Sequence, residues 1–160
     1  MMLRATRLFN VLSTALSQEE LIARVGLLGE SEIFSVVPSG ELSALATMFE
    51  PVTFADGETV FAAGDDATHM LVVASGELLV RSATAPTVTL RRGSTVGEYG
   101  AWETGRRTAT VVARGTSSAL QLDYDRFQRF LLAFPESCLA LLKLTVGRVN
   151  GAEAPVADDR

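Results

Sequence analysis

With 160 residues, of which 48% are hydrophobic and 21% charged, the chain is long enough to bury one hydrophobic core and too short for two ordinary domains. No uninterrupted apolar run approaches the about 18 residues of a membrane-spanning helix, and the formal net charge of -5 argues against nucleic acid as a partner. One cysteine, Cys138, excludes an internal disulfide, and the first residues lack a secretory signal pattern, so we expect a cytoplasmic chain, either free or as the cytosolic part of a membrane protein.

The first thirty residues show the apolar spacing of helices. Apolar side chains recur at helical intervals from Leu8 to Val25, and Ser17-Gln18-Glu19-Glu20 has the pattern of a second helix start. We predict one bent helix or two helices over residues 3–28, within an N-terminal segment of residues 1–30. Two arrangements stay open: this segment packs on a second copy or an upstream domain, or it packs back on the rest of the chain.

A shorter helix and then a series of short strands are predicted next. Ser39 is expected to cap a helix over Glu41 to Phe49. The dipeptides Asp56-Gly57 and Ser75-Gly76 each predict a turn between two strands. The runs "TVTLRRGSTVG", "RTATVVARG" and "SSALQLD" predict three more strands, and strands this short, with turns every eight to twelve residues, indicate an antiparallel sandwich or roll.

From Tyr124 the pattern is helical again. One helix is predicted to stop at Pro135, and a second to run on to Gly151 before a disordered tail of residues 151–160. Pro135 is therefore an expected hinge. In the second helix, Leu139, Leu142 and Val146 form an apolar stripe that could close over the mouth of the roll.

The stretch "VGEYGAWETGRRTATV", residues 96–111, is the best candidate for chemistry. A strand that leads into a glycine and a short helix exposes backbone N–H groups, which suit a phosphate, and an arginine such as Arg107 would complete the site. Glu98 could accept hydrogen bonds from a ribose. The alternative is an exposed ion pair between Glu98 and Arg106 or Arg107 around an ordinary turn, and the spacing alone favours that alternative.

The segment "GEYGAWETGRRTAT" resembles the phosphate-binding cassette of cyclic nucleotide-binding domains. The similarity continues in "SEIFSVVPSGELSALA", "FADGETVFAAGDDATHMLVVASGEL" and "LDYDRFQRFLLAFP", so that about residues 31–150 are covered. It implies a mainly β fold with flanking helices: an eight-stranded antiparallel β-roll, jelly-roll-like, with C-terminal hinge and lid helices. The chain departs from the family pattern at Arg106, often a proline, and at Tyr99-Gly100-Ala101-Trp102.

The resemblance also implies a set of binding residues. Gly97, Glu98, Tyr99 and Gly100 would bind the sugar and phosphate, and Arg107 would pair with the cyclic phosphate. Thr108 would contact phosphate or purine, and Arg148 on the lid helix would contact the purine. For Arg148 the alternative is a solvated arginine near the end of a helix.

The implied function is a regulatory sensor that binds cAMP or cGMP, uses no metal, and signals to a fused or docked channel, transporter or enzyme domain. The alternative is a family fold that no longer binds nucleotide and acts as a scaffold. A transcription regulator of the catabolite-activator kind would carry a helix-turn-helix after the lid helix, and the given chain has about ten residues beyond Asn150. Glu98 and Arg107 are both present, which favours a working site.

Catalysis and metal binding are not expected. His69 is the only histidine, so a metal site in a similar β-roll would lack ligands, and His69 lies in a hairpin without a recognisable motif. Cys138 falls in an apolar helical stripe and is interpreted as a core residue.

Overall fold

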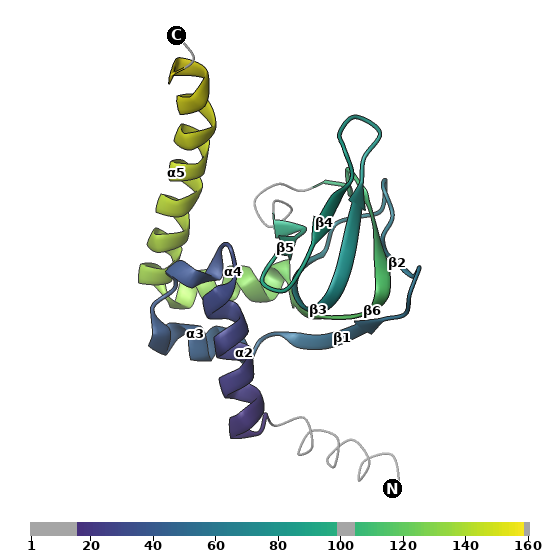
Figure 1. Ribbon diagram of the computed structural model, residues 1–160. Coiled ribbons are helices and arrows are strands. Elements are labelled where there is room, and N and C mark those ends of the chain that lie inside the picture. Colours follow the sequence, from purple (N-terminus) through teal and green to yellow (C-terminus); the bar gives the residue numbers. More distant parts are fainter. Residues whose placement is uncertain (1–15, 99–104, 159–160) are drawn as a thin grey trace, which may run out of the picture.

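The computed structural model describes residues 16–98 and 105–158, with side chains as far as Arg148. Helices gather on one side of a curled β-sheet (Figure 1). Three of these elements precede the strands: α2 (Gln18–Glu30), the 3-10 helix η1 (Phe34–Val36) and α3 (Ser39–Ala46). The remaining two, α4 (Tyr124–Ala133) and α5 (Pro135–Asp158), follow them.

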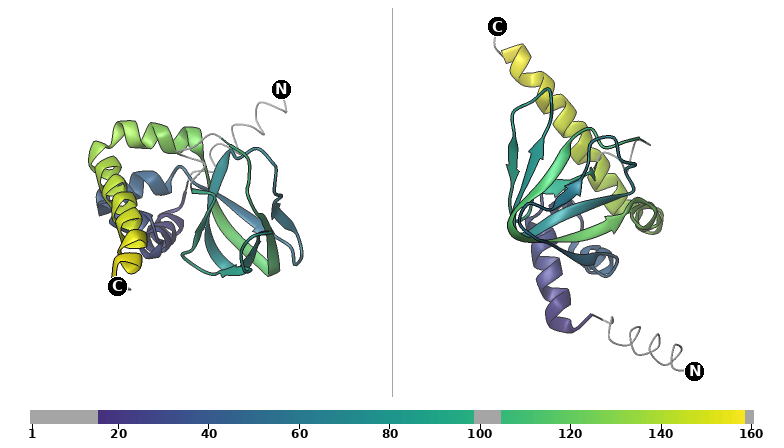
Figure 2. Two further views of the ribbon diagram at one scale, coloured as in Figure 1. Left: turned by 90° about the horizontal axis from the view of Figure 1, so that it is seen from above. Right: turned by 90° about the vertical axis from the view of Figure 1, so that its right-hand side faces the viewer.

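The described strands form one six-stranded antiparallel sheet, which wraps around its own interior (Figure 2). Its central path runs β1-β6-β3-β4, while β2 pairs with β6 and β5 pairs with β3. The strands are β1 (Glu50–Phe54), β2 (Thr59–Phe61), β3 (His69–Arg81), β4 (Val88–Leu90), β5 (Thr95–Val96) and β6 (Thr110–Asp123). This architecture confirms the predicted mainly β roll with flanking helices.

Two long strands explain why six strands are seen where eight were expected. β3 and β6 pair with each other along most of their length, with register shifts between Val73 and Glu77. Gly76, with φ 74°, bends β3 there instead of ending it, so the predicted turn at Ser75-Gly76 is wrong. Likewise "RTATVVARG" and "SSALQLD" belong to the single strand β6. If β3 and β6 are each counted as two strands, the sheet has the expected eight strands.

The first predicted turn is correct, but its strands are not partners. Gly57 has φ 80°, and β1 and β2 lie on either side of it. Both strands pair with β6 and not with each other. The local sequence predicts the turn, whereas the pairing depends on a strand some sixty residues away, which accounts for the difference.

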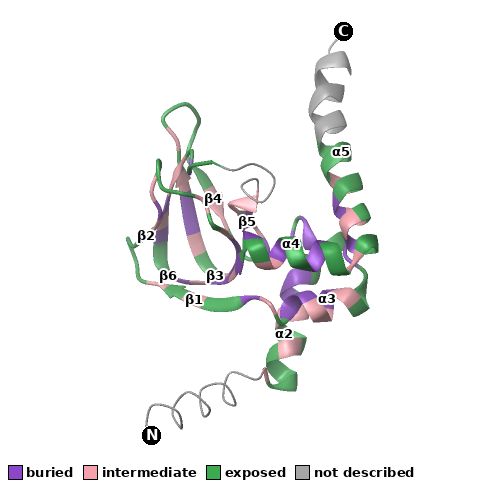
Figure 3. Ribbon diagram, turned by 180° about the vertical axis from the view of Figure 1, so that it is seen from behind, coloured by how far each residue is buried: buried purple, intermediate pink, exposed green. Residues whose placement is uncertain are grey.

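Both faces of the central strands are buried. In β3, Met70 and Val72 pack in a core shared with the helices, whereas Leu71 and Val73 point into the roll, as the alternation of a strand requires. The helix-side core contains Phe34, which packs edge-to-face on Phe127. Figure 3 shows these buried stretches along β3 and between the helices. The continuous run of apolar residues in β3 is thus explained by burial on two sides.

The N-terminal helix packs on this same core. α2 begins with a capping box, in which the Ser17 hydroxyl accepts from the Glu20 N–H and the Glu20 carboxylate accepts from the Ser17 N–H. Its Leu27 and Leu28 are buried in the helix-side core. Residues 18–30 therefore pack back on the rest of the chain, which is one of the two arrangements left open by the sequence. Residues 3–15, on which the dimer alternative mainly rests, lie outside the described residues.

The boundaries of α3 differ slightly from the prediction. The N-cap is Pro38, without a side-chain hydrogen bond, and Ser39 is the first helical residue, so the predicted Ser39 cap is wrong. The helix ends at Ala46 and not at the predicted Phe49, although Leu42, Leu45 and Phe49 are all buried. Proline fixes its own φ and suits a helix start, which shifts the boundary by one residue.

The two C-terminal helices meet at a sharp bend, at the helix break that the sequence predicted before Pro135. α4 ends before Pro135, and the axes of α4 and of residues 135–148 of α5 differ by 114°. Within the described residues no single helix is long and apolar enough to cross a membrane, and only this bent pair passes by length and composition. α5 is helical as far as Asp158, through part of the predicted disordered tail.

Candidate functional site

A cavity of about 390 Å³ opens in the roll and contains most of the predicted binding residues. Its apolar wall comes from five strands and comprises Phe61, Val80, Val88, Leu90, Val96 and Val111. Gly97, Glu98, Arg106, Arg107 and Thr108 line it as well. An apolar wall with a few converging polar groups is the usual composition of a small-ligand site.

Arg107 is the buried cation of this cavity, with 9% of the residue exposed. Its Nη2 donates to the backbone carbonyl of His69 at 2.5 Å, and its Nη1 donates to the Tyr124 hydroxyl at 3.2 Å. The guanidinium carbon lies 3.6 Å from the centre of the Phe61 ring. All three contacts are neutral. Arg107 takes part in none of the ion pairs found among the described residues.

Gly97 allows the backbone to approach this guanidinium. It follows β5 directly and has φ 83°, a conformation that favours glycine. A Cβ at this position would lie 2.5 Å from Nη1 of Arg107 and 3.1 Å from the carbonyl oxygen of His69. The close contact between the turn and the guanidinium therefore requires the absence of a side chain.

Glu98 carries its carboxyl group at the same edge of the cavity. Burial raises its pKa, and the nearby Glu32 carboxylate raises it further, while a backbone hydrogen bond and Arg148 act in the opposite direction. No ion pair in the described residues joins Glu98 to an arginine, and Arg106 instead donates to the carbonyl of Gly64 at 3.3 Å. The alternative of an exposed pair between Glu98 and Arg106 or Arg107 thus has no support in this part of the chain.

The remaining predicted site residues fall in three groups. Thr108 lines the cavity and is exposed. Tyr99 and Gly100 lie outside the described residues, as does the short helix expected after them. Arg148 is exposed on α5, does not line the cavity, and donates from Nη2 to the carbonyl of Glu32 at 3.1 Å. The structure thus brings Gly97, Glu98, Arg107 and Thr108 together without Arg148.

The sequence analysis missed two side chains that hold Arg107. Phe61, at the end of β2, supplies the ring beneath the guanidinium, and Tyr124, the first residue of α4, supplies a hydroxyl. That hydroxyl also donates to the carbonyl of Gly97. Burial raises the pKa of Tyr124 against the opposing effect of Arg107, so the phenol keeps its proton. Neither residue belongs to the motif, and only the folded arrangement places them beside it.

His69 contributes its backbone, not its ring. Burial lowers the pKa of its imidazole and the positive charge of Arg107 lowers it further, while Asp123 opposes the shift. The ring hydrogen-bonds to Thr68 and packs near Phe61. In the described residues no group of three or more His, Cys, Asp or Glu side chains could hold a metal ion.

Comparison with known proteins places this site in a wider context. A family model described as "Cyclic nucleotide-binding domain" matches residues 51–134. The CRP-like cAMP-activated global transcriptional regulator of Mycobacterium tuberculosis is 27% identical over 146 residues, covering 88% of this chain and 62% of the regulator. The human cyclic nucleotide-gated channel beta-3 is 28% identical over 123 residues, which are 73% of this chain and 15% of the channel.

A solved structure shows the same architecture. The N-terminal domain of a transcriptional regulator from Streptomyces coelicolor A3(2) superposes with a TM-score of 0.73 at 25% identity, over 81% of this chain and 94% of that domain. The present chain spans less than two thirds of the length of the two relatives named above.

Proposed function

The chain belongs to the cyclic nucleotide-binding domain family, and on that premise we propose that it is a regulatory sensor whose cavity binds a 3′,5′-cyclic purine nucleotide. One observation carries the proposal: Arg107 is a buried guanidinium that contacts only neutral groups among the described residues. A buried charge without a counter-ion is costly, and an anion beside it removes that cost. The singly charged phosphodiester of a cyclic nucleotide is such an anion.

The other lining residues fit the rest of a nucleotide. The turn at Gly97 carries no side chain and lies directly against the Arg107 guanidinium, so an anion bound by Arg107 would also lie close to the backbone of the turn. Glu98 can accept hydrogen bonds from a ribose hydroxyl, and the apolar wall formed by Val80, Val88 and Leu90 suits a purine. Tyr99 and Gly100 complete the proposed set on the family pattern, and Thr108 is placed to contact phosphate or purine.

We take cAMP as the first ligand to test and cGMP as the second. The Mycobacterium tuberculosis relative is named as cAMP-activated, and Thr108 is compatible with either nucleotide. Isothermal titration with cAMP, cGMP and the open-ring control 5′-AMP tests the proposal. Saturable binding of at least one cyclic nucleotide, stronger than that of 5′-AMP, is expected. Binding of neither would favour the non-binding scaffold.

The signal is proposed to leave through the C-terminal helices. Leu139, Leu142 and Val146 of α5 are 51%, 56% and 51% exposed. α5 stands beside the roll (Figure 1), and none of its described side chains lines the cavity. A nucleotide in the cavity would gain contacts if this stripe and Arg148 closed over it, so binding would favour the closed arrangement. A fused or docked domain, in the cytosol, would then read the position of α5.

Spin labels test this movement. One label at the exposed Ala63 on the roll and one at the exposed Lys143 on α5, with Cys138 replaced by alanine, report the distance between the two parts. Saturating cAMP should shift the distance distribution. Identical distributions with and without bound nucleotide would rule the movement out.

A further inference from the structure

Tyr124 lies where three functional segments of the molecule meet. Its hydroxyl accepts a hydrogen bond from Nη1 of Arg107 at 3.2 Å and donates one to the carbonyl of Gly97. Gly97 follows β5, Arg107 precedes β6, and Tyr124 is the first residue of α4. One buried phenol therefore connects both halves of the anion site with the first C-terminal helix.

The nitrogen that Tyr124 binds is the one that an anion at the turn would need. Nη1 of Arg107 is the atom that an added Cβ at Gly97 would meet, at 2.5 Å. The other terminal nitrogen, Nη2, is held by the carbonyl of His69. Because an added Cβ would already lie 2.5 Å from Nη1, a phosphate oxygen can be seated against Gly97 only if Nη1 shifts, and that shift lengthens its bond to the phenol. The bond from Nη1 to an anionic oxygen is the stronger of the two, since both of its partners are charged.

The backbone around Tyr124 leaves little room for adjustment between strand and helix. The Tyr124 N–H donates to the carbonyl of Thr68 at 3.0 Å, and the preceding Asp123 is still paired with His69 in the sheet. α4 starts with no connecting loop after β6. A change at the Tyr124 hydroxyl is therefore transmitted to the first turn of α4.

We propose that Tyr124 is the positioning residue that couples a phosphate on Arg107 to the start of α4. Without an anion its hydroxyl holds Arg107 and Gly97 together and fixes α4 in the arrangement seen here. An anion at Gly97 takes over Nη1, the bridge opens, and the first turn of α4 is released. This inference rests on the proposed function, because the anion is the phosphate of the cyclic nucleotide.

The variant Tyr124→Phe tests the proposal, since it removes the hydroxyl and keeps the ring in the core. A bond that exists only without ligand opposes binding, so its loss should tighten cAMP binding about 3- to 10-fold. Spin labels at Ala63 on the roll and at the 83% exposed Leu132 on α4 should report, without nucleotide, a distance shifted toward that of the cAMP-saturated wild type. Unchanged or weaker binding, or an unshifted distance, would overturn the role of Tyr124.

A double-mutant cycle and a control separate this role from general destabilisation. In an Arg107→Ala background, Tyr124→Phe should no longer shift the label distance, because the bridge between Arg107 and Gly97 is already broken there. Ser75→Ala removes a different hydroxyl bond, to Ser118 at 2.6 Å on the bent part of β3, and should leave affinity and distance as in the wild type. A shift that persists without Arg107 would count against the coupling.

A second measurement covers a variant that does not fold, and the wild-type titration separates failure of this proposal from failure of the proposed function. Should Tyr124→Phe fail to fold, amide hydrogen exchange of the wild type replaces it: cAMP should speed exchange in the first turn of α4, and unaltered exchange would overturn the proposal. Should the wild type bind neither cAMP nor cGMP, the proposed function fails. Nucleotide binding by the wild type with an indistinguishable Tyr124→Phe variant refutes the coupling alone.

Discussion

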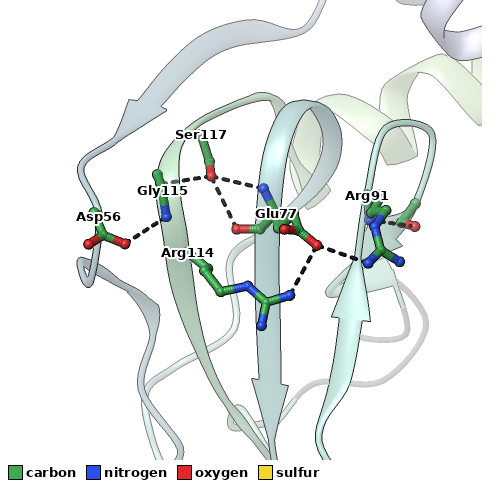
Figure 4. Close-up of polar contacts among 7 residues, drawn as sticks. Asp56, Glu77, Arg91, Arg114, Gly115 and Ser117 are labelled. Atoms are coloured by element: carbon green, nitrogen blue, oxygen red, sulfur yellow. Dashed lines mark hydrogen bonds and ion pairs between the residues drawn. The ribbon is translucent and has the colours of Figure 1, made fainter.

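Two regions of the roll differ in how their charged side chains are partnered. At the bend of β3 and β6 the acid Glu77 bridges Arg91 and Arg114, each at 3.1 Å, and the neighbouring Asp56 accepts from the backbone of Gly115 (Figure 4). At the cavity, Arg107 and Glu98 are buried more deeply, and neither joins an ion pair among the described residues. The more exposed charges are thus paired with one another, and the more buried ones are not.

The pKa shifts of two glutamates express the same difference. Hydrogen bonding to Arg114, with the charges of Arg114 and Arg91, lowers the pKa of Glu77. Burial raises the pKa of Glu98. A bend whose polar groups bind one another serves the fold, whereas a cavity whose charged groups lack partners is suited to a ligand that supplies them. Each of the following predictions tests one side of this contrast.

The largest effect is expected for Arg107→Ala on nucleotide binding. Losing a desolvated charge-assisted contact typically costs about 2–5 kcal/mol, so the affinity for the cyclic nucleotide should fall by roughly 30-fold or more. Arg114→Ala removes the same charge from the bend of β3 and β6, outside the cavity lining, and serves as the matched control. Isothermal titration of both variants compares them, and equal affinities would refute the assignment of Arg107.

The next largest effect concerns the bend and is measured on stability. At Gly76 a Cβ would lie 2.3 Å from the Ser117 hydroxyl and 2.7 Å from backbone atoms, at φ 74°. Gly76→Ala should therefore lower the free energy of unfolding by about 2 kcal/mol or more, without a direct effect on ligand contacts.

A neighbouring glycine provides the control for that experiment. Gly115 has a similar φ of 73° but no atom within 4 Å of an added Cβ, so Gly115→Ala should cost only the backbone strain of about 1 kcal/mol. Urea unfolding of both variants gives the comparison. Equal losses would show that the contact with Ser117 is unimportant.

A smaller effect is expected in the pH dependence of stability. Because the pKa of Glu98 is raised on folding above its usual 4.5, the native state holds its proton longer than the unfolded state, and stability falls as the pH rises through that window. Glu98→Gln removes this loss, so its advantage over the wild type should appear above about pH 4.5 and vanish below it. Chemical unfolding from pH 4 to 8 measures the difference. A pH-independent difference would contradict it.

The smallest effect is expected for Glu77→Gln. In the wild type the pKa of Glu77 is lowered from 4.5. Any stabilisation by this carboxylate is therefore present above pH 4.5 and is lost as the pH falls through the lowered pKa, so stability changes with pH in the opposite direction to that expected for Glu98. Exposed ion pairs contribute little, and salt screens them. We expect unfolding close to that of the wild type at physiological salt and an unchanged nucleotide affinity. A salt-independent loss of stability would show that the pair matters more than its exposure indicates.

The sequence predicted features that depend on neighbouring residues better than features that depend on contacts between distant segments. The capping box at Ser17, the turn at Gly57 and the stop before Pro135 depend on neighbouring residues, and all three are present. The turn predicted at Ser75-Gly76 is a bend, because the strand continues in pairing with β6. Propensity suggested a turn there, and tertiary pairing prevailed.

The candidate site shows the same limit. Gly97, Glu98, Arg107 and Thr108 could be named from one motif because they are close in sequence. Phe61 and Tyr124 could not, since they belong to other strands and helices and carry no motif of their own. The carbonyl of His69, a partner of Arg107, is a backbone group that no residue type reveals.

Because α4 follows β6 directly, a small rotation at Tyr124 would produce a large displacement at the far end of the C-terminal helices. A helix rises about 1.5 Å per residue, so the 10 residues of α4 and 24 of α5 extend about 15 Å and 36 Å from one joint at Tyr124 and one elbow at Pro135. A rotation of about 10° at the joint would carry the far end of α5 through something of the order of 5 Å, given that rise. If Tyr124 moves α4 as proposed, a displacement of a few tenths of an ångström at the phenol would become roughly ten times larger at the far end of α5, and helix length would set that ratio.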